Sequence, residues 1–222
     1  MEDIVETFFS KGYEKKINEN ILYYKFPESE VREYARNIIR EPLSSYVSYV
    51  LNDSVKEQVI SKDVVQFSNW DDATINICRK LKDINNPGVN FFDAGKLLLD
   101  DGKDRKDTAV IKYGENHIKT CAEIGLAFQY YKTYYLSGIG YIYVGMEAQD
   151  REKLITRLII RSKLIKRLIQ TTKLGNVELR DFLYMLSDST YLRRRSNMKN
   201  MVDILYHAED PDLDILIERI QF

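Results

Sequence analysis

The 222-residue sequence predicts a mainly α-helical protein, on three observations. Apolar residues recur at helical spacing in most segments. Only two short runs, 126–130 and 133–137, have the aromatic and β-branched character of strands. A helix, a short turn and a strongly basic helix follow one another near the C-terminus. The length allows one large domain or two small ones, and 44% hydrophobic residues are enough to build their cores.

We expect a helical region of unknown role over residues 1–86. Its clearest helix carries apolar residues in the pattern i, i+3, i+4, i+7, at Val31, Tyr34, Ala35, Ile38 and Ile39. Pro42 interrupts this pattern and begins a second helical stretch. Asp71 is placed to cap a further helix over 73–84. The Asn-Asn-Pro-Gly run at 85–88 is the clearest break in the chain and predicts a domain boundary.

Residues 87–147 predict a winged-helix domain. Short helices are expected over 91–99, 108–113 and 115–124, with Gly114 after the second helix, where a positive φ is needed, and Gly125 closing the third. The two β-like runs then meet around residues 131–133. Three short helices followed by a two-stranded wing is the element order of a winged helix-turn-helix.

Residues 148–222 predict a second, C-terminal helix-turn-helix domain. Ser137 is a suitable N-cap for a helical segment that leads into this region. A long basic amphipathic helix is expected from Ala148 to near Gly175, followed by a helix over 177–186. Ser187 and Asp188 form a short turn, and a basic helix then runs through 190–205.

Charge is unevenly distributed along a chain whose formal net charge is −1. Residues 148–200 contain 13 Lys and Arg against 5 Asp and Glu, a net charge of +8. Residues 1–60 carry a net −3 (8 basic, 11 acidic), and residues 201–222 a net −5 (1 basic, 6 acidic). Because basic side chains that neutralise phosphates release condensed counterions, the central block is typical of a polyanion binder. The alternative is a solvated helix face without a ligand.

Several classes of site and segment are excluded or disfavoured by composition. Cys78 and Cys121, with His117 and His207, are too few for a disulfide framework or a His/Cys metal cage, so both thiols are expected in the core. No metal or other cofactor is expected. No apolar run reaches the ~20 residues of a membrane span. The acidic N-terminus lacks the basic start of a secretory signal, and we expect a cytoplasmic protein without a membrane partner.

Two constellations are candidates for duplex DNA contact. The first is the polar start of the helix predicted over 115–124, together with the tip of the wing, because recognition helices present short polar and basic side chains at their N-termini. Its candidate residues are Asn116, His117, Lys119, Thr120 and, on the wing, Lys132.

The second constellation is the start of the C-terminal basic helix. Small hydroxyls precede three consecutive arginines, which point about 100° apart, so that at most one or two can reach bases while the others contact phosphates or pack over neighbouring segments. Its candidate residues are Ser189, Thr190, Arg193, Arg194, Arg195 and Asn197. An exposed charged helix without a ligand is the alternative.

The segments KYGENHIKTCAEIGLAF (112–128), YYLSGIGY (134–141) and LSDSTYLRRRSNMKNMVDIL (186–205), with the long basic helix between the last two, carry a family resemblance. Their order resembles tandem winged-helix modules attached to bacterial restriction endonucleases and related defence proteins. The resemblance covers about residues 88–206 and leaves the N-terminal third unmatched. It implies DNA target recognition in a restriction or defence system, with a nuclease or methyltransferase as partner. His117, Lys119 and Tyr191 depart from the pattern and leave the target sequence open.

Catalysis is weakly indicated. Metal-dependent nucleases need carboxylates and a nearby lysine, and short Asp/Glu-x-Lys strings occur at 14–16, 101–103 and 104–106, but none follows a convincing strand. No phosphate-binding glycine loop or nucleophile elbow is present in the sequence. We therefore predict a DNA-binding protein, with a homodimer as one arrangement. The alternatives are a free-standing winged-helix transcription regulator, a metal-dependent DNA endonuclease with an unrecognised active site, and a helical adaptor for an acidic partner.

Overall fold

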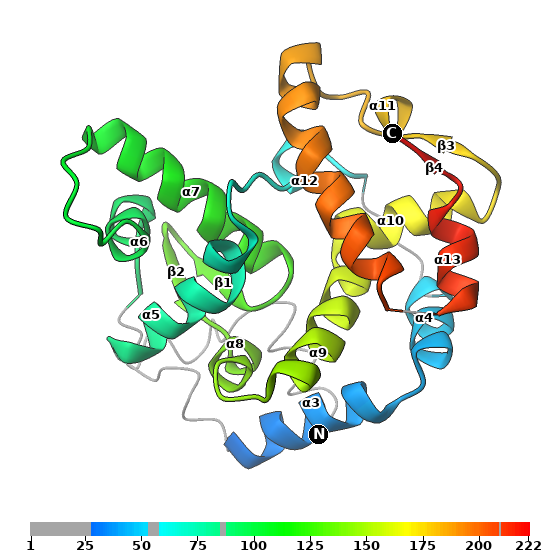
Figure 1. Ribbon diagram of the computed structural model, residues 1–222, viewed down its shortest axis with the longest axis horizontal. Coiled ribbons are helices and arrows are strands. Elements are labelled where there is room, and N and C mark those ends of the chain that lie inside the picture. The colour runs from blue at the N-terminus through cyan, green and yellow to red at the C-terminus, as the bar shows by residue number, and fades with distance from the viewer. Residues whose placement is uncertain (1–27, 53–57, 85–87, 209) are drawn as a thin grey trace. The chain divides into compact units, whose positions relative to one another are not determined.

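The computed structural model describes residues 28–52, 58–84, 88–208 and 210–222, and these are mainly helical, as predicted (Figure 1). The described residues divide into two compact units. Unit 1 comprises residues 28–37 and 67–148, and unit 2 comprises residues 38–66 and 149–222, less the gaps. The N-terminal third is therefore shared between both units. None of the described helices is both long and apolar enough to cross a membrane.

In the N-terminal residues that the structure describes, two helices meet at the predicted break. Helix α3 spans Glu28–Arg40 and helix α4 spans Leu43–Asn52. Pro42 lies between them, because its ring and its missing N–H end a helix and permit a new first turn. Helix α4 buries Tyr46, Val47, Val50 and Leu51 in unit 2. A short 3₁₀ turn, η2 (Ser61–Asp63), precedes the passage into unit 1.

Unit 1 continues with a helix built from η3 (Asp72–Asn76) and α5 (Ile77–Asp83). The sequence assigned its cap to Asp71, and this is wrong. Asp71 already has helical dihedral angles, φ −64° and ψ −35°. The cap is Asn69, whose Oδ1 accepts hydrogen bonds from the backbone N–H groups of Asp71 (2.9 Å) and Asp72 (3.4 Å).

Helices α6 (Phe91–Leu98) and α7 (Asp107–Glu123) pack closely in unit 1. The sequence predicted two helices separated at Gly114, whereas α7 is continuous through that residue. A Cβ on Gly114 would lie 1.9 Å from the carbonyl oxygen of Phe91, and one on Gly95 would lie 2.1 Å from that of Val110. Both glycines therefore serve the close approach of two backbones, and Gly114 does not end a helix.

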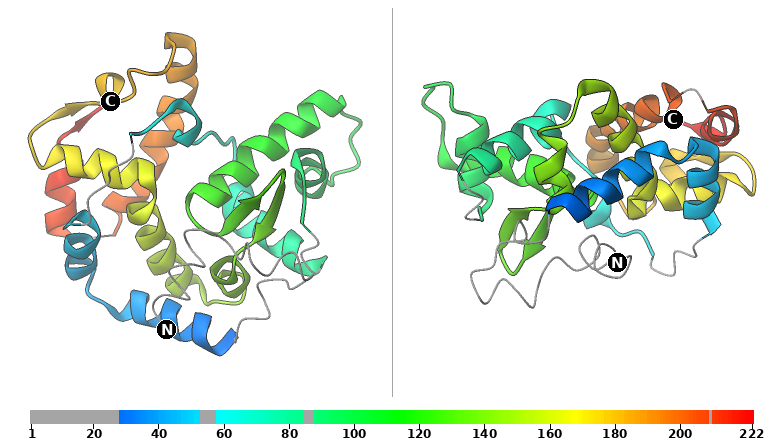
Figure 2. Two further views of the ribbon diagram at one scale, coloured as in Figure 1. Left: turned by 180° about the vertical axis from the view of Figure 1, so that it is seen from behind. Right: turned by 90° about the horizontal axis from the view of Figure 1, so that it is seen from below.

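The predicted hairpin follows α7 and lies beside it (Figure 2). Strands β1 (Ala127–Tyr130) and β2 (Thr133–Leu136) pair antiparallel around a two-residue turn, Tyr131-Lys132. Val89 adds a single antiparallel bridge to Tyr134, with backbone hydrogen bonds of 2.9 and 2.8 Å. Helix α8 (Gly138–Tyr143) begins at the predicted N-cap, since the Ser137 hydroxyl accepts from the Gly140 N–H at 3.0 Å.

Unit 2 resumes with α9 (Ala148–Arg161) and α10 (Lys163–Thr172). The sequence predicted one helix here, but Ser162 adopts ψ 141° and separates the two. The helix expected over 177–186 is also mostly absent. Its start is strand β3 (Val177–Glu178), and its helical part is the single turn α11 (Leu179–Phe182).

The C-terminal part consists of α12 (Asp188–Tyr206), α13 (Pro211–Ile217) and strand β4 (Ile220–Gln221). Strand β4 pairs parallel with β3. Helix α13 packs against α12, α10 and α4, so the core of unit 2 joins segments from both ends of the chain (Figure 1). Leu164, Leu168, Met201 and Leu213 are fully buried in this core.

Candidate nucleic-acid interface

The first turn of α12 is fixed by short-range polar contacts. The Ser187 hydroxyl donates to Thr190 Oγ1 at 3.0 Å and lies 3.4 Å from the Ser189 hydroxyl. Arg180 of α11 bonds the Asp188 carboxylate at 2.7 Å across the intervening turn. The predicted hydroxyl-bearing helix start therefore exists and is held against α11, with Ser189 exposed and Thr190 half-buried.

Helix α12 has one buried and one exposed side. The buried residues recur at helical spacing, at Tyr191, Met198, Met201, Val202 and Leu205. The exposed side carries Ser189, Leu192, Arg193, Arg195, Ser196, Lys199 and Asn200. Asn197 was predicted to contact DNA, but its side chain is only 7% exposed and belongs to the buried side. The surface available to a ligand is thus a basic and hydroxyl-bearing strip.

The three consecutive arginines have different surroundings. Arg193 folds back along its own helix and donates to Thr190 Oγ1 at 3.3 Å and to the Ser189 carbonyl at 3.3 Å. Arg195 is exposed. Because successive residues turn by about 100°, Arg193 and Arg195 lie about 160° apart, one at each edge of the exposed strip.

Arg194 is directed away from that strip and onto the segment 61–64. Its Nη1 donates to the carbonyl oxygens of Ser61 at 2.6 Å and Val64 at 2.9 Å. The sequence predicted a DNA contact for Arg194, and this needs correction because its guanidinium is engaged by the protein backbone. Sequence reasoning missed this tie, since the two partners lie 133 and 130 residues away along the chain.

A second tie fixes the same segment. Asp63 is 9% exposed, and its Oδ2 accepts from the backbone N–H of Ile60 at 2.9 Å and from Lys163 Nζ at 2.8 Å. Lys163 begins α10, so the segment 60–64 links α10 to α12 within unit 2. Its ion pair and carbonyl contacts hold α12 in place from the side opposite the exposed strip.

The candidate residues on α7 of unit 1 divide between surface and core. His117 is fully buried, and its Nε2 accepts from the backbone N–H groups of Ser68 (3.3 Å) and Asn69 (3.4 Å). Its Nδ1 lies 2.7 Å from the Tyr113 carbonyl, so Nδ1 carries the proton. Burial lowers the pKa of His117. Thr120 is 1% exposed and donates to the Asn116 carbonyl at 2.9 Å.

The predicted DNA contacts of His117 and Thr120 are therefore corrected: both side chains complete the core of unit 1. The remaining candidates lie at its surface. Lys119 is exposed but bonds Glu115 at 2.7 Å, and Lys112 bonds the same carboxylate at 2.8 Å. Asn116 is half-buried on the same helix, and Lys132 is exposed at the hairpin tip.

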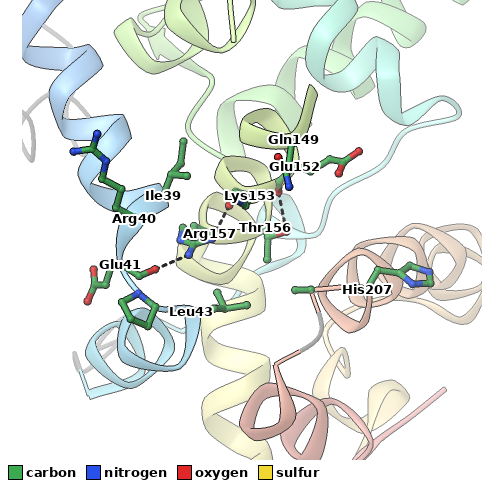
Figure 3. A pocket seen from close by; sticks show the side chains of 12 residues that line it. Ile39, Arg40, Glu41, Leu43, Gln149, Glu152, Lys153, Thr156, Arg157 and His207 are labelled. Carbon is green, nitrogen blue, oxygen red and sulfur yellow. Dashed lines mark hydrogen bonds between the residues drawn. The ribbon is translucent and has the colours of Figure 1, made fainter. Parts of the chain in front are cut away.

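The sequence did not reveal a hollow of about 660 Å³ in unit 2 (Figure 3). It lies between the α3–α4 junction, the first half of α9 and the end of α12. Arg157, only 5% exposed, lines it and donates to the carbonyls of Glu41 (2.7 Å) and Lys153 (3.1 Å). No sequence motif predicts this hollow, because its residues are distant in the chain and of common types.

Among the described residues, no group of three or more His, Cys, Asp or Glu side chains is placed to hold a metal ion. Cys78 and Cys121 are fully buried, as predicted, with their sulfur atoms 3.8 Å apart. Burial raises the pKa of the Cys78 thiol, which disfavours the reactive thiolate.

Comparison with known proteins returns no relative: no protein-family model, no curated protein and no solved structure matches this chain. The structure itself defines a mainly helical protein of two compact units.

Proposed function

We propose that this protein binds duplex DNA and that the exposed strip of α12 enters the major groove. The observation that carries the proposal is the arrangement of that strip, in which mostly polar side chains lie between two arginines. Arg193 and Arg195 lie at its two edges, and the exposed residues between them are Ser189, Leu192, Ser196, Lys199 and Asn200. An α-helix fits the major groove, where central side chains face base edges and flanking cations face the phosphates of the two strands.

The placement of α12 supports the same proposal. It follows the single turn α11 and a short connection, which is the helix-turn-helix order. Its buried side is anchored to unit 2 through Arg194 and the core methionines, so the exposed strip is presented on a fixed helix. A recognition element needs such rigidity, because base contacts require side chains held in position.

Unit 1 is proposed to be a winged helix. The order α5, the Val89 bridge, α6, α7 and the β1–β2 hairpin supports this assignment. We propose that Lys132 at the hairpin tip contacts the DNA backbone. We propose that helix α7 contributes less to DNA binding than α12, because the Glu115 carboxylate pairs with both Lys112 and Lys119 and offsets part of their charge. The resemblance to restriction-associated modules is the ground for proposing that DNA binding serves a restriction or defence system.

The test is the salt dependence of binding to duplex oligonucleotides. We expect the logarithm of the affinity to fall steeply with the logarithm of salt concentration for the parent protein. Arg195→Gln and Lys199→Gln should each weaken binding and reduce the magnitude of the slope by about 1. Lys173→Gln is the matched control, since Lys173 is an exposed cation of the same unit outside the strip.

Equal affinities for the parent and both α12 variants would refute the assignment of α12. Absence of salt-dependent binding would refute DNA binding itself. If the parent protein does bind duplex DNA, a selection of binding sites from random duplexes would define the sequence that it recognises.

A further inference from the structure

The two cysteines of this chain meet inside unit 1. Cys78 lies on α5 and Cys121 on α7, and both side chains are fully buried. Their sulfur atoms are in contact, 3.8 Å apart, although the two residues are separated by 43 positions in the sequence. The full sequence contains two cysteines in all, so neither thiol has a competing cysteine within the chain.

This placement is close to that of a disulfide bond. The sulfur atoms of a disulfide lie about 2.05 Å apart, so the present gap has to close by less than about 2 Å. Rotation about the two Cα–Cβ bonds moves both sulfur atoms by distances of that order, and α5 and α7 already pack against each other. Two thiols held side by side also have a high effective concentration toward each other, which favours the intramolecular bond over a bond to an external thiol.

We propose that Cys78 and Cys121 form an intramolecular disulfide, with a small-molecule disulfide such as oxidised glutathione as the oxidant. One cysteine thiolate attacks a sulfur of oxidised glutathione, which forms a mixed disulfide and releases one glutathione thiolate. The other cysteine thiolate then attacks the protein sulfur of the mixed disulfide, which forms the protein disulfide and releases the second glutathione thiolate. The two thiol protons pass to the two glutathione thiolates, and two electrons pass from the protein sulfurs to the oxidant.

Burial determines when this reaction takes place. The attacking species is the thiolate, and burial both raises the pKa of the Cys78 thiol and separates the two sulfur atoms from an oxidant of tripeptide size. The exchange therefore takes place while unit 1 is folding or is locally open. The packing around the finished disulfide then protects it from reductants in the same way.

The disulfide links two helices of the same unit. It closes a loop that contains α6 and most of α7, and residues 78–121 all belong to unit 1. A cross-link stabilises a protein largely by restricting its unfolded chain, and the effect is larger for longer loops. We therefore expect the bond to stabilise unit 1 and to be independent of DNA binding by α12, which belongs to unit 2.

The experiment refolds the full reduced chain from denaturant in a buffer of oxidised and reduced glutathione. Remaining thiols are alkylated with iodoacetamide before intact mass spectrometry. We expect the main product to have lost two hydrogen atoms and to carry neither an alkyl group nor glutathione, and peptide mapping should show Cys78 joined to Cys121. The Tm of this product should exceed that of the reduced protein by several degrees.

A second measurement tests whether the fold brings the two thiols together. The equilibrium constant for forming the disulfide from oxidised glutathione is measured for the folded chain and for the chain in concentrated denaturant. We expect it to be at least tenfold larger for the folded chain, because packing holds the sulfur atoms in contact. Cys78→Ala and Cys121→Ala are the matched controls. Each variant has a single thiol, so oxidised glutathione should give no intramolecular product and no rise in Tm.

Three outcomes would overturn the proposal. One is that free thiols or glutathione adducts remain the main product at every ratio of oxidised to reduced glutathione. Another is that the disulfide is no more favoured in the folded chain than in denaturant. The third is a lower Tm for the oxidised than for the reduced protein, because the pair would then fit the core only as two thiols.

Discussion

Single residues in this protein often have partners far away in the sequence. His117 is the clearest case: a polar helix residue completes the core because backbone N–H groups of residues 68 and 69 donate to its ring. Those two N–H groups need an unprotonated Nε2 as their acceptor. In the protonated ring, Nε2 would carry an N–H of its own, directed at the two donors. The same residue that suggested a DNA contact is therefore a structural acceptor.

A pH-dependent stability follows from His117. Because burial lowers its folded-state pKa below the unfolded value of about 6.5, the unfolded chain binds a proton first as the pH falls. The contribution of neutral His117 to the free energy of unfolding should be fully present above a pH of about 6.5. Below that pH this contribution should decrease by at most about 1.4 kcal/mol per pH unit, until the folded-state pKa is passed. Urea unfolding at pH 7.5 and pH 5.5 measures the effect. His117→Gln, which removes this titration but keeps His207, should show a smaller difference between the two pH values; an equal difference would refute the assignment.

Arg194 and Arg195 should differ in what their loss changes. Arg194→Ala removes two hydrogen bonds from a charged donor to backbone carbonyls and should destabilise the protein by about 1–3 kcal/mol. Arg195→Ala should change stability by less than about 0.5 kcal/mol, because the side chain is exposed. Denaturant unfolding of the two variants tests this. Equal stabilities would show that the contacts to segment 61–64 contribute nothing.

At the scale of elements, local chemistry predicted several boundaries and tertiary packing determined the others. The break at Pro42, the Ser137 cap and the hairpin were predicted because each depends on residues adjacent in the chain. Gly114 was wrongly interpreted as a helix end. A glycine is typical both of helix ends and of close backbone contacts, and only the fold distinguishes the two. The break at Ser162 was missed because the apolar pattern continues across it.

The α6–α7 crossing gives a test of the second role of Gly114. Gly114→Ala introduces a Cβ within 1.9 Å of the Phe91 carbonyl oxygen, so the helices must separate, at a cost of about 2 kcal/mol or more. Gly145→Ala is the matched control in unit 1, because its nearest neighbour atom lies at 3.7 Å. Thermal unfolding should show a lower Tm for the first variant only. A stability gain with Gly114→Ala, as expected at an ordinary helix position, would contradict the packing described.

The candidate site was predicted in part. The basic helix with a hydroxyl-bearing start exists as α12, because periodicity and charge are visible in sequence. Which of its arginines face outward was not visible, since that depends on carbonyl partners in residues 61–64. The hollow around Arg157 was missed for the same reason: it is lined by three segments that only the fold brings together.

At the scale of the whole molecule, the two units are interleaved along the chain. Unit 2 needs its first segment, 38–66, because α4 packs against α10 and α13, Glu41 accepts from Arg157, and Asp63 pairs with Lys163. We therefore expect the isolated fragment 149–222 to be largely unfolded. Mixing it with a peptide of residues 38–66 should restore helical circular dichroism and a cooperative transition. A fragment 149–222 that folds alone with the same Tm would contradict this dependence.

The interleaving also sets an order of events during synthesis. Residues 38–66 emerge from the ribosome before unit 1 is finished, but their partners come only after residue 148. At a translation rate of roughly 5–20 residues per second, α10 and α13 are synthesised on the order of ten seconds after α4. During that interval Val47, Val50 and Leu51 have no native cover from those helices. We therefore expect the apolar face of α4 to stay without its native cover until α13 has left the ribosome.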